Sequence, residues 1–366
     1  MSNLRIPGPT PIPPEIQKAM GIQMINHRGP EFAALHGRLV QGLQKAFQTK
    51  NEIFLLTTSG TGGMEAAVAN FFSPGDHILS VTIGVFGDRF ATIAEKFGAK
   101  VTRVKAELGQ AADPAAVRAA LQANPDVKGA LVTHNETSTG VTNDLEAIAR
   151  EVKAAGKLLV VDAVSSLGSI NLPVDAWNCD VVVSGSQKGW MVPPGLAFVS
   201  VSAEGWKAND TAKMSRYYFD LGQARTYAKR NQTPWTPAIS IMAALDVSLK
   251  MLEKEGYQQV FARHQRVAER TRNGLKALGL SLLAEPKRAS NTVTAARLPD
   301  GVKGEDLLKI LRDEHDTVLG EGQGPLTGKI IRVGHLGWVP DEDIDAVFTA
   351  LRQSLPKVGF VPAGVK

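Results

Sequence analysis

Lys188 is the residue whose surroundings point most directly to chemistry. It lies in the polar turn 184–189, directly after the valine run 181–183. Three consecutive valines predict a buried strand, and the turn after such a strand lies where open α/β sheets bind their ligands. A lysine in that position is suited to forming a covalent imine with a cofactor aldehyde. Because most lysines are solvated surface charges, this hypothesis depends on the neighbouring segments.

Asp162 and Thr137 fall at comparable points earlier in the sequence. Asp162 follows the apolar run 159–161 and precedes Lys188 by 26 residues, and Thr137 precedes Asp162 by 25. Each interval accommodates one helix and one returning strand, so the three side chains are expected at one edge of a sheet. A carboxylate there either holds a pyridine nitrogen protonated or caps a turn. Thr137 belongs to the polar loop 134–140, for which a solvated loop with a helix cap is the alternative.

Thr61, Gly62 and Gly63 belong to a small-residue turn that begins at Ser59 and leads into the helical stretch 64–68. Glycines permit close approach of the backbone, and the amide groups at the start of a helix favour a phosphate. The turn lacks the lysine of a nucleoside-triphosphate loop and the spacing of a dinucleotide fingerprint. It therefore predicts either a monophosphate-binding site or a simple turn.

The elements that must position these residues alternate between short apolar runs and helical stretches from about residue 53 to residue 202. This alternation predicts a largely parallel sheet covered by helices. Strands are expected at residues 53–57, 77–81, 100–104, 129–133, 158–161, 181–183 and 197–201.

A long helix at residues 239–255 is expected to lead out of the sheet domain. After it, helix and strand signals alternate less regularly, which predicts a smaller α+β domain that the N-terminal segment 8–14 could join. We therefore expect an N-terminal arm at residues 1–20, a large domain at residues 21–255 and a small C-terminal domain at residues 256–366.

The composition narrows the classes of function. The 366 residues are 43% hydrophobic and 21% charged, as in globular proteins, and the net charge of +5 is dispersed along the chain. This balance fits small anionic ligands better than nucleic acid. No apolar stretch suits a bilayer span or a signal peptide, so no membrane contact and a cytoplasmic location are expected. The single cysteine, Cys179, excludes an internal disulfide and a multi-thiolate metal site, and no metal is expected.

The phosphate turn, the strand-end carboxylate and the strand-end lysine, in this order, resemble a pyridoxal-phosphate enzyme of fold type I. The chain is specifically similar to class V aminotransferases close to the alanine:glyoxylate and serine:glyoxylate enzymes. This resemblance implies a mostly parallel seven-stranded sheet with helices on both faces and a smaller C-terminal α+β domain. It runs nearly end to end and rests on Gly8-Pro9-Thr10-Pro11, Ser59-Gly60-Thr61-Gly62, Glu136-Thr137-Ser138-Thr139-Gly140, Val161-Asp162-Ala163-Val164-Ser165-Ser166-Leu167-Gly168, Ser184-Gly185-Ser186-Gln187-Lys188, Pro193-Pro194-Gly195 and Ile331-Arg332-Val333-Gly334.

The resemblance also implies roles at the cofactor, pyridoxal 5'-phosphate. Lys188 would bind it covalently and later move the α-proton, and Asp162 would pair with the ring nitrogen. Phe86, where family members often have tryptophan, would stack on the ring, and Thr137 would face the ring hydroxyl. The cofactor phosphate would be held by Thr61, Gly62, Gly63 and Gln187.

Substrate and subunit contacts are implied in the same way. Arg332 would hold the substrate carboxylate through a two-pronged hydrogen bond, with a structural salt bridge as its alternative role. Thr10 stands near the substrate, where some relatives have glycine. Gln232 and Thr233 would reach the phosphate site of a neighbouring subunit, which predicts a homodimer with shared active sites.

The expected activity is transamination of a small amino acid, alanine or serine, with glyoxylate or a similar 2-oxo acid. Aspartate and ureidoglycine are alternative donors, since the sequence does not distinguish them. A lyase or desulfurase of the same fold is a further alternative, weakened because Cys179 precedes a predicted core strand. Two alternatives from other classes of function are a non-catalytic binding protein and a nucleotide-binding dehydrogenase. A visible absorption band that disappears on borohydride treatment would show a cofactor imine and so exclude both.

Overall fold

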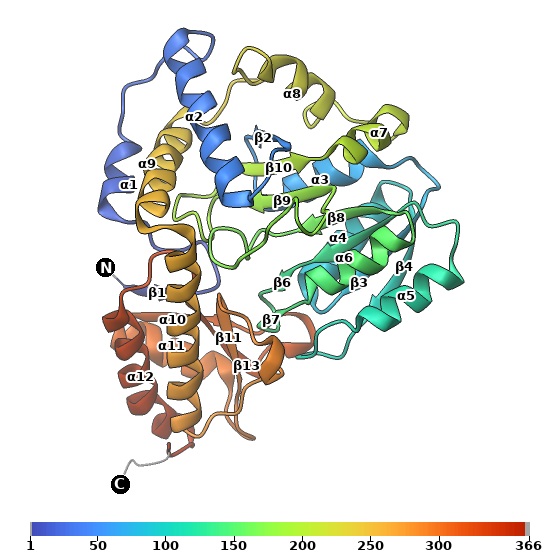
Figure 1. Ribbon diagram of the computed structural model, residues 1–366. Helices are drawn as coiled ribbons and strands as arrows, with labels where there is room; N and C mark the ends of the chain where they lie inside the picture. The colour runs from blue at the N-terminus through green and yellow to red at the C-terminus, as the bar shows by residue number, and fades with distance from the viewer. Residues whose placement is uncertain (1, 363–366) are drawn as a thin grey trace.

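A seven-stranded sheet forms the centre of the larger part of the molecule. The computed structural model describes residues 2–362, and Figure 1 shows the sheet flanked by helices. Its strands, in spatial order, are β2 (Glu52–Leu56), β10 (Ala197–Val201), β9 (Val181–Gly185), β8 (Leu158–Asp162), β5 (Gly129–Thr133), β3 (His77–Thr82) and β4 (Lys100–Lys105). Only the two pairings of β10, with β2 and with β9, are antiparallel. The mostly parallel seven-stranded sheet expected from the sequence is confirmed.

Side chains along each strand point alternately to the two faces of the sheet. Each face packs into its own hydrophobic core, so both faces are buried. Leu79 and Val81 of β3 pack with the helices on one face, whereas Ile78 packs on the other. The first face is covered by α2 (Pro30–Phe47), α5 (Pro114–Ala123), α6 (Leu145–Ala154) and α9 (Ile239–Glu255). The second face is covered by α3 (Gly60–Phe71), α4 (Val85–Lys96), α7 (Ala203–Thr211) and α8 (Leu221–Ala228). Near-continuous apolar strands are typical of parallel sheets covered in this way.

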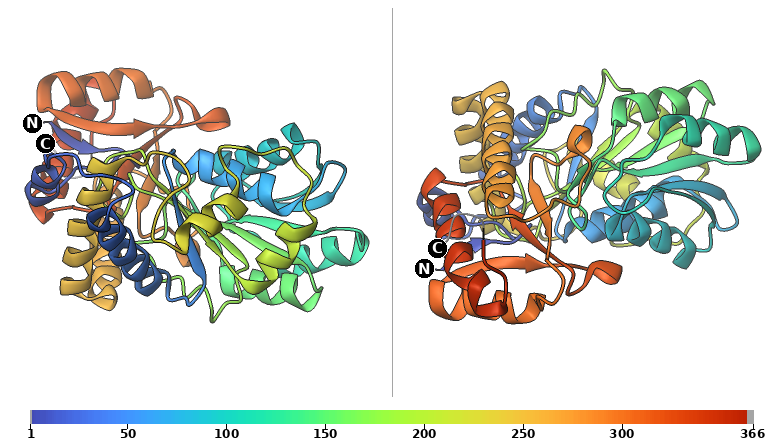
Figure 2. Two further views of the ribbon diagram at one scale, coloured as in Figure 1. Left: turned by 90° about the horizontal axis from the view of Figure 1, so that it is seen from above. Right: turned by 90° about the horizontal axis from the view of Figure 1, so that it is seen from below.

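A four-stranded sheet lies beside this layer and joins residues 3–5 with strands between residues 293 and 334. Its order is β1 (Asn3–Arg5), β12 (Thr317–Glu321), β13 (Ile330–Gly334) and β11 (Val293–Arg297). Strand β1 pairs in parallel with β12, so the first residues described are built into the sheet of the last third of the chain. Figure 2 shows the N-terminus beside the C-terminal helices. The remaining elements are α1 (Pro14–Ala19), β6 (Asn135–Glu136), β7 (Val141–Thr142), α10 (Tyr257–Ala277), α11 (Gly304–His315), α12 (Asp341–Ser354) and the short 3-10 helices η1 (Pro286–Arg288), η2 (Gly324–Leu326) and η3 (Leu355–Val358).

The four-stranded sheet has its own core, which α10, α11 and α12 complete. Val267 and Leu275 of α10 pack there with Leu311 and Val347. Earlier in the same helix, Val260 belongs to the core of the large sheet. Helix α10 therefore joins the two cores (Figure 1). Within residues 2–362 no helix has the length and apolar character needed to cross a membrane.

Candidate active site

The side chain of Lys188 is buried in the turn that follows β9, with 9% of its surface exposed. Burial lowers its pKa to about 8, and the nearby positive charge of Arg332 contributes in the same direction. The negative charges of Asp162 and Glu136 oppose this shift. An amine with a lowered pKa is more often unprotonated near neutral pH, which is what a nucleophilic lysine needs.

The N-terminal arm covers this lysine. The ammonium group donates a hydrogen bond to the main-chain oxygen of Pro7. Gly8 follows with φ of +124°, and a Cβ atom placed on it would lie 2.7 Å from Nζ of Lys188. The Thr10 amide donates to the Gln187 oxygen at 3.1 Å, and the Thr10 hydroxyl donates to the Lys188 oxygen at 3.1 Å. Thr10, predicted near the substrate, therefore fixes the arm to the lysine turn.

Asp162 lies at the end of β8 and is almost completely buried. One carboxylate oxygen accepts from the Val164 amide at 3.0 Å, and the other accepts from the Thr133 hydroxyl at 3.3 Å. Burial raises the pKa of Asp162 to about 6, and the charge of Glu136 adds to the rise. Among the residues that the structure describes, no lysine, arginine or histidine lies within ion-pair distance of this carboxylate. The turn-capping contact to Val164 is present, and it leaves the negative charge without a cationic partner.

The turn with Thr61, Gly62 and Gly63 forms the first residues of α3. Ser59 occupies the N-cap position, and in the described part of the chain its side chain caps no amide of the helix. A Cβ at Gly63 would lie 2.7 Å from Val183 and 2.9 Å from Ala197, so this glycine lets α3 approach the sheet. A Cβ on Gly185, in the lysine turn, would lie 3.2 Å from Cα of Gly60, so the start of α3 packs against this turn. Helix starts of this kind favour anions.

Phe86 and Arg89 lie one turn apart on α4. The Arg89 guanidinium is 4.6 Å from the centre of the Phe86 ring and donates to the Thr61 hydroxyl at 3.4 Å. The positive charge of Arg89 also lowers the pKa of Lys188. These contacts and the effect of the Arg89 charge bring the predicted stacking residue and the predicted phosphate turn into the neighbourhood of the lysine.

Arg332 lies on β13 and reaches across to the loop after β5. Its Nε donates to the Glu321 oxygen at 2.7 Å, and its Nη1 donates to the Thr137 oxygen at 2.9 Å. Burial lowers its pKa to about 10, while the charges of Glu136 and Glu321 act in the opposite direction. Within the described ranges no carboxylate forms an ion pair with Arg332. The structural salt bridge considered as an alternative is therefore not what holds this guanidinium.

Gln187 precedes Lys188 in the turn, and its buried Oε1 atom has no hydrogen-bond partner among residues 2–362. Gln232 and Thr233 lie elsewhere, in the segment before α9. Arg28 donates to the Gln232 side chain at 3.4 Å and to the Thr233 oxygen at 2.6 Å. Within residues 2–362, no hydrogen bond connects Gln232 or Thr233 with the lysine turn of their own subunit.

Glu136 belongs to this site and was not assigned a role from the sequence. It is fully buried in β6, and its charge acts on the pKa of Lys188, Asp162 and Arg332. The one available signal was its place in the polar loop 134–140, because a glutamate is rarely buried without a specific set of donors.

Known proteins with similar sequences include aminotransferases and one protein named for a different activity. Residues 14–332 match the sequence family described as Aminotransferase class-V. A protein of Anabaena cylindrica named "Soluble hydrogenase 42 kDa subunit" is 45% identical over 359 residues, 97% of this chain and 94% of that protein. The L-aspartate–glyoxylate aminotransferase of Paracoccus denitrificans is 38% identical over 342 residues, 92% of this chain and 86% of that enzyme.

The fold has close counterparts among solved structures. The crystal structure of alanine–glyoxylate aminotransferase from Nostoc sp. superposes with a TM-score of 0.93 and 32% identity, covering 97% of this chain and 95% of that one. This likeness confirms the fold type I architecture that the sequence motifs implied. It also means that the motifs occur within one shared framework rather than as isolated matches.

Proposed function

Because the chain belongs to the class V aminotransferase family, we propose that it transfers the amino group of a small amino acid to glyoxylate or a similar 2-oxo acid. Enzymes of this family and fold depend on pyridoxal phosphate, and we propose the same cofactor here. The aspartate–glyoxylate and alanine–glyoxylate aminotransferases described above share glyoxylate and differ in the donor. Glyoxylate is therefore the better supported half of the reaction. For the donor we propose alanine or serine, with aspartate and ureidoglycine as alternatives.

The buried, unpaired carboxylate of Asp162 is the observation that best supports this cofactor. A buried carboxylate without a cationic partner is costly, and a protonated ring nitrogen would supply the missing charge. The start of α3, which has no side-chain cap from Ser59, suits a phosphate in the same way. Gln187 could donate to that phosphate only through its NH₂ group. When bound there, the cofactor would supply a ring that accepts electrons from the substrate carbon.

The chain's own residues then have separate tasks. Lys188 would hold the cofactor and move a proton at the substrate carbon, since its lowered pKa lets it gain and lose a proton near neutral pH. Asp162 would keep the ring nitrogen protonated. Arg332 would bind the carboxylate common to the amino acid and the oxo acid, because its guanidinium is held by neutral oxygens and keeps its charge for a ligand. The arm over Lys188 would exclude water from these groups.

Two other activities have weaker support. A desulfurase of this fold would use a mobile cysteine, and Cys179 is buried before β9, where burial raises the pKa of its thiol. The hydrogenase name belongs to the Anabaena relative. Iron–sulfur centres are held by several thiolates, and this chain has one cysteine. The residues therefore favour transamination over either activity.

We also propose a homodimer with shared active sites. Tyr217 is 77% exposed and stacks on Trp235 with ring centres 5.0 Å apart, next to Gln232 and Thr233. Exposed aromatic side chains on a fixed segment are typical of protein interfaces. Gln232 and Thr233 would then reach the phosphate of the partner subunit.

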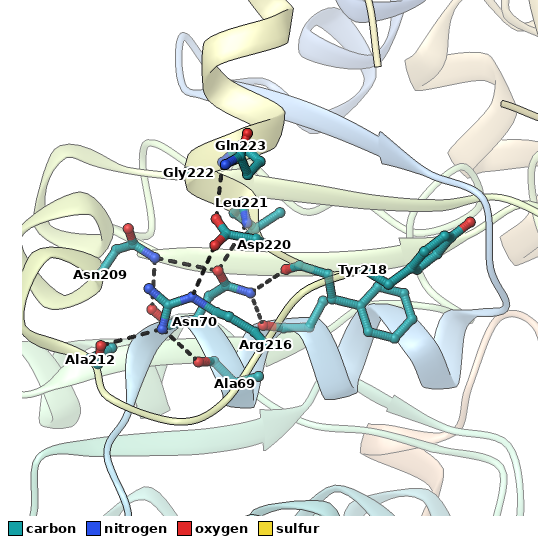
Figure 3. Close-up of polar contacts among 12 residues, drawn as sticks. Ala69, Asn70, Asn209, Ala212, Arg216, Tyr218, Asp220, Leu221, Gly222 and Gln223 are labelled. Atoms are coloured by element: carbon teal, nitrogen blue, oxygen red, sulfur yellow. Dashed lines mark hydrogen bonds and ion pairs between the residues drawn. The ribbon is translucent and has the colours of Figure 1, made fainter. Parts of the chain in front are cut away.

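The aromatic segment is anchored to the helix that begins at the phosphate turn. Figure 3 shows Asn70 of α3 and Arg216 joined to the residues around Asp220. The Leu221 amide donates to Asn70 at 3.0 Å, and Arg216 donates to the Ala69 oxygen at 3.1 Å. A surface held in this way loses little conformational entropy on association. This rigidity supports an interface at Tyr217 and Trp235.

The remaining expectations stay part of the proposal. We propose small-molecule partners without nucleic acid or membrane contacts, in keeping with the dispersed net charge of +5. A cytoplasmic location agrees with the single buried thiol. We also retain the division into an arm at 1–20, a large domain at 21–255 and a small domain at 256–366.

One assay tests the activity. Purified protein loaded with pyridoxal phosphate is incubated with glyoxylate and each of a panel of amino acids, and glycine formation is measured. We expect turnover with alanine or serine and none in Lys188→Ala. Glycine formation that is equal in both proteins, or absent with every donor, would contradict the proposal. Hydrogen-dependent reduction of a viologen dye by the same preparation would instead support the name of the Anabaena relative.

A further inference from the structure

The first turn of α4 is capped by a distant loop and not by its own N-cap residue. Gly84 occupies the N-cap position, and the described residues include no side-chain cap from it. The Val85 amide instead donates to the Ser138 hydroxyl at 3.0 Å. The amides of Phe86 and Gly87 donate to Oε2 of Glu136 at 3.0 and 3.1 Å. All three free amides at the start of the helix are therefore satisfied by residues about 50 positions away in the sequence.

Gly84 makes room for this arrangement. A Cβ atom on Gly84 would lie 2.4 Å from the Ser138 hydroxyl and 2.6 Å from Cγ of Glu136. A side chain at the N-cap position would supply a local cap and would also displace the distant one. The glycine is therefore required by the position of Glu136.

The carboxylate of Glu136 is fully buried and fully hydrogen-bonded. Its second oxygen, Oε1, accepts from the amide of Ser138 at 3.0 Å and from the Ser138 hydroxyl at 2.7 Å. Burial raises the pKa of Glu136, and these donors together with the amides of α4 oppose the rise. The start of a helix also carries partial positive charge, which favours an anion there. Every donor in contact with the group suits the ionised form.

The loop that contains Glu136 also holds two other parts of the site. Thr137 accepts the hydrogen bond from Arg332, and α4 carries Phe86 together with Arg89, which contacts Thr61. A shift of the first turn of α4 would therefore move the ring of Phe86 relative to Arg332, which is bonded to the same loop. Small displacements of this kind have large effects on catalysis, because the reacting groups must be aligned.

We propose that Glu136 is a positioning residue of the active site, which fixes the first turn of α4 and so sets the Phe86 ring in register with Arg332. The inference rests on the proposed function for its effect on catalysis. Its structural half, that Glu136 fixes α4, does not depend on the cofactor. Glu136 contacts neither of the reacting groups assigned above and acts through Phe86 and the loop at Thr137.

Glu136→Gln tests the inference with little change in shape. An amide has only one oxygen, so its NH₂ group must face one of the N–H groups that now donate to the carboxylate. We expect hydrogen exchange at the amides of residues 85–87 to accelerate about tenfold, since charge-assisted hydrogen bonds are lost. In the loaded enzyme we expect an altered visible circular dichroism band of the cofactor and a fall in kcat/KM of about tenfold or more. Asp113→Asn is the matched control, because Asp113 caps α5 through the Ala115 amide at 2.9 Å, outside the site.

A second variant separates geometry from charge. Ser138→Ala removes the acceptor of the Val85 amide and keeps the carboxylate, so we expect smaller changes in the same direction. It also decides the question by the same measurements if Glu136→Gln does not fold. Two results would overturn the proposal. One is faster hydrogen exchange at residues 85–87 with an unchanged dichroism band and unchanged kcat/KM, which would make Glu136 a helix cap only. The other is unchanged hydrogen exchange at these residues. Failure of the unmodified protein to bind pyridoxal phosphate would overturn the proposed function instead. Hydrogen exchange in the cofactor-free protein would still test whether Glu136 fixes the first turn of α4.

Discussion

The amine of Lys188 donates a hydrogen bond to the main-chain oxygen of Pro7, which lies in a segment 181 positions away in the sequence. The contact places the N-terminal arm directly on the residue to which we assign the covalent chemistry. Because the arm contacts Lys188 and its turn, changes in the arm should affect catalysis.

Gly8→Ala should impair catalysis without unfolding the protein. The new Cβ would lie 2.7 Å from Nζ of Lys188, so the lysine or the arm must move. We expect kcat/KM to fall by about tenfold or more. Gly156→Ala is a suitable control, because Gly156 also has a positive φ, +69°, but open space around its Cβ position. If both variants lose the same activity, the cause is backbone strain and not displacement of Lys188.

Lys188→Ala should abolish turnover and leave the fold intact, because the turn has no other side chain that can bind an aldehyde. The measurement is glycine formation together with mass spectrometry after borohydride treatment. In the unmodified protein we expect the cofactor attached to the peptide that contains residue 188. Full activity in the variant would exclude the assignment.

Asp162→Asn should have opposite effects on rate and on stability. A neutral amide cannot hold a ring nitrogen protonated by ion pairing, so we expect kcat to fall by more than about tenfold, or about 1.4 kcal/mol of transition-state stabilisation. The amide oxygen can keep the contact to Val164. A variant with an unchanged rate would show that Asp162 only caps its turn.

The stability effect follows from the raised pKa of Asp162, about 6 against an ordinary value of 3.8. Between these pH values the folded protein binds a proton that the unfolded chain releases, so the unfolding free energy of the cofactor-free protein falls as pH rises. Asp162→Asn should remove this fall and be more stable at pH 8 by on the order of 3 kcal/mol. Urea unfolding of both proteins at several pH values measures this difference in unfolding free energy. If the unfolding free energies of the two proteins change with pH in parallel, Asp162 is not a buried, unpaired charge.

Arg332→Lys should raise the KM for both the amino acid and the oxo acid, because a point charge replaces a two-pronged donor. We expect an increase of about tenfold. An amine without a carboxylate should react as slowly with the variant as with the unmodified enzyme. If the variant loses thermal stability while both KM values stay the same, Arg332 is structural.

The homodimer predicts that cofactor binding and association are linked, since Gln232 and Thr233 would contact the partner's phosphate. Sedimentation of the cofactor-free and loaded forms should show a dimer that the cofactor tightens. Tyr217→Glu should weaken it, because a charge would be buried in the interface. Leu108→Glu, at an exposed apolar residue elsewhere, should not. A fully active loaded monomer would exclude a shared site.

The parts of the fold that local patterns determine were predictable from the sequence. The strands Gly129–Thr133 and Ala197–Val201 and the helix Ile239–Glu255 have the predicted bounds, because apolar runs and helical periodicity are local signals. The strand ends also placed Lys188 and Asp162 at one sheet edge. Their roles stay predictions, and the structure adds the burial and contacts that make them testable.

Contacts between distant segments were not predictable in the same way. Strand β1 has three residues, and its partner β12 lies more than 300 positions later, so no local pattern identifies it. Glu136 was part of a quoted motif, but its amide partners on α4 depend on how β5 and α4 pack. Gly63 was predicted to bind a phosphate, and its close approach to Val183 shows that it also lets α3 pack on the sheet. A glycine in the sequence does not reveal which of these two roles it has.

The pairing of β1 with β12 fixes the order in which the site can be completed during synthesis. The residues that follow β1 cover Lys188, yet β1 acquires its partner strand only after Thr317–Glu321 has been made. Until then strand β1 has no partner, whereas all seven strands of the large sheet, which end at Val201, have already been made. Residues 3–5 can therefore pair only after residues 317–319 have been made, and a chain that stops before residue 317 lacks the strand that holds its arm.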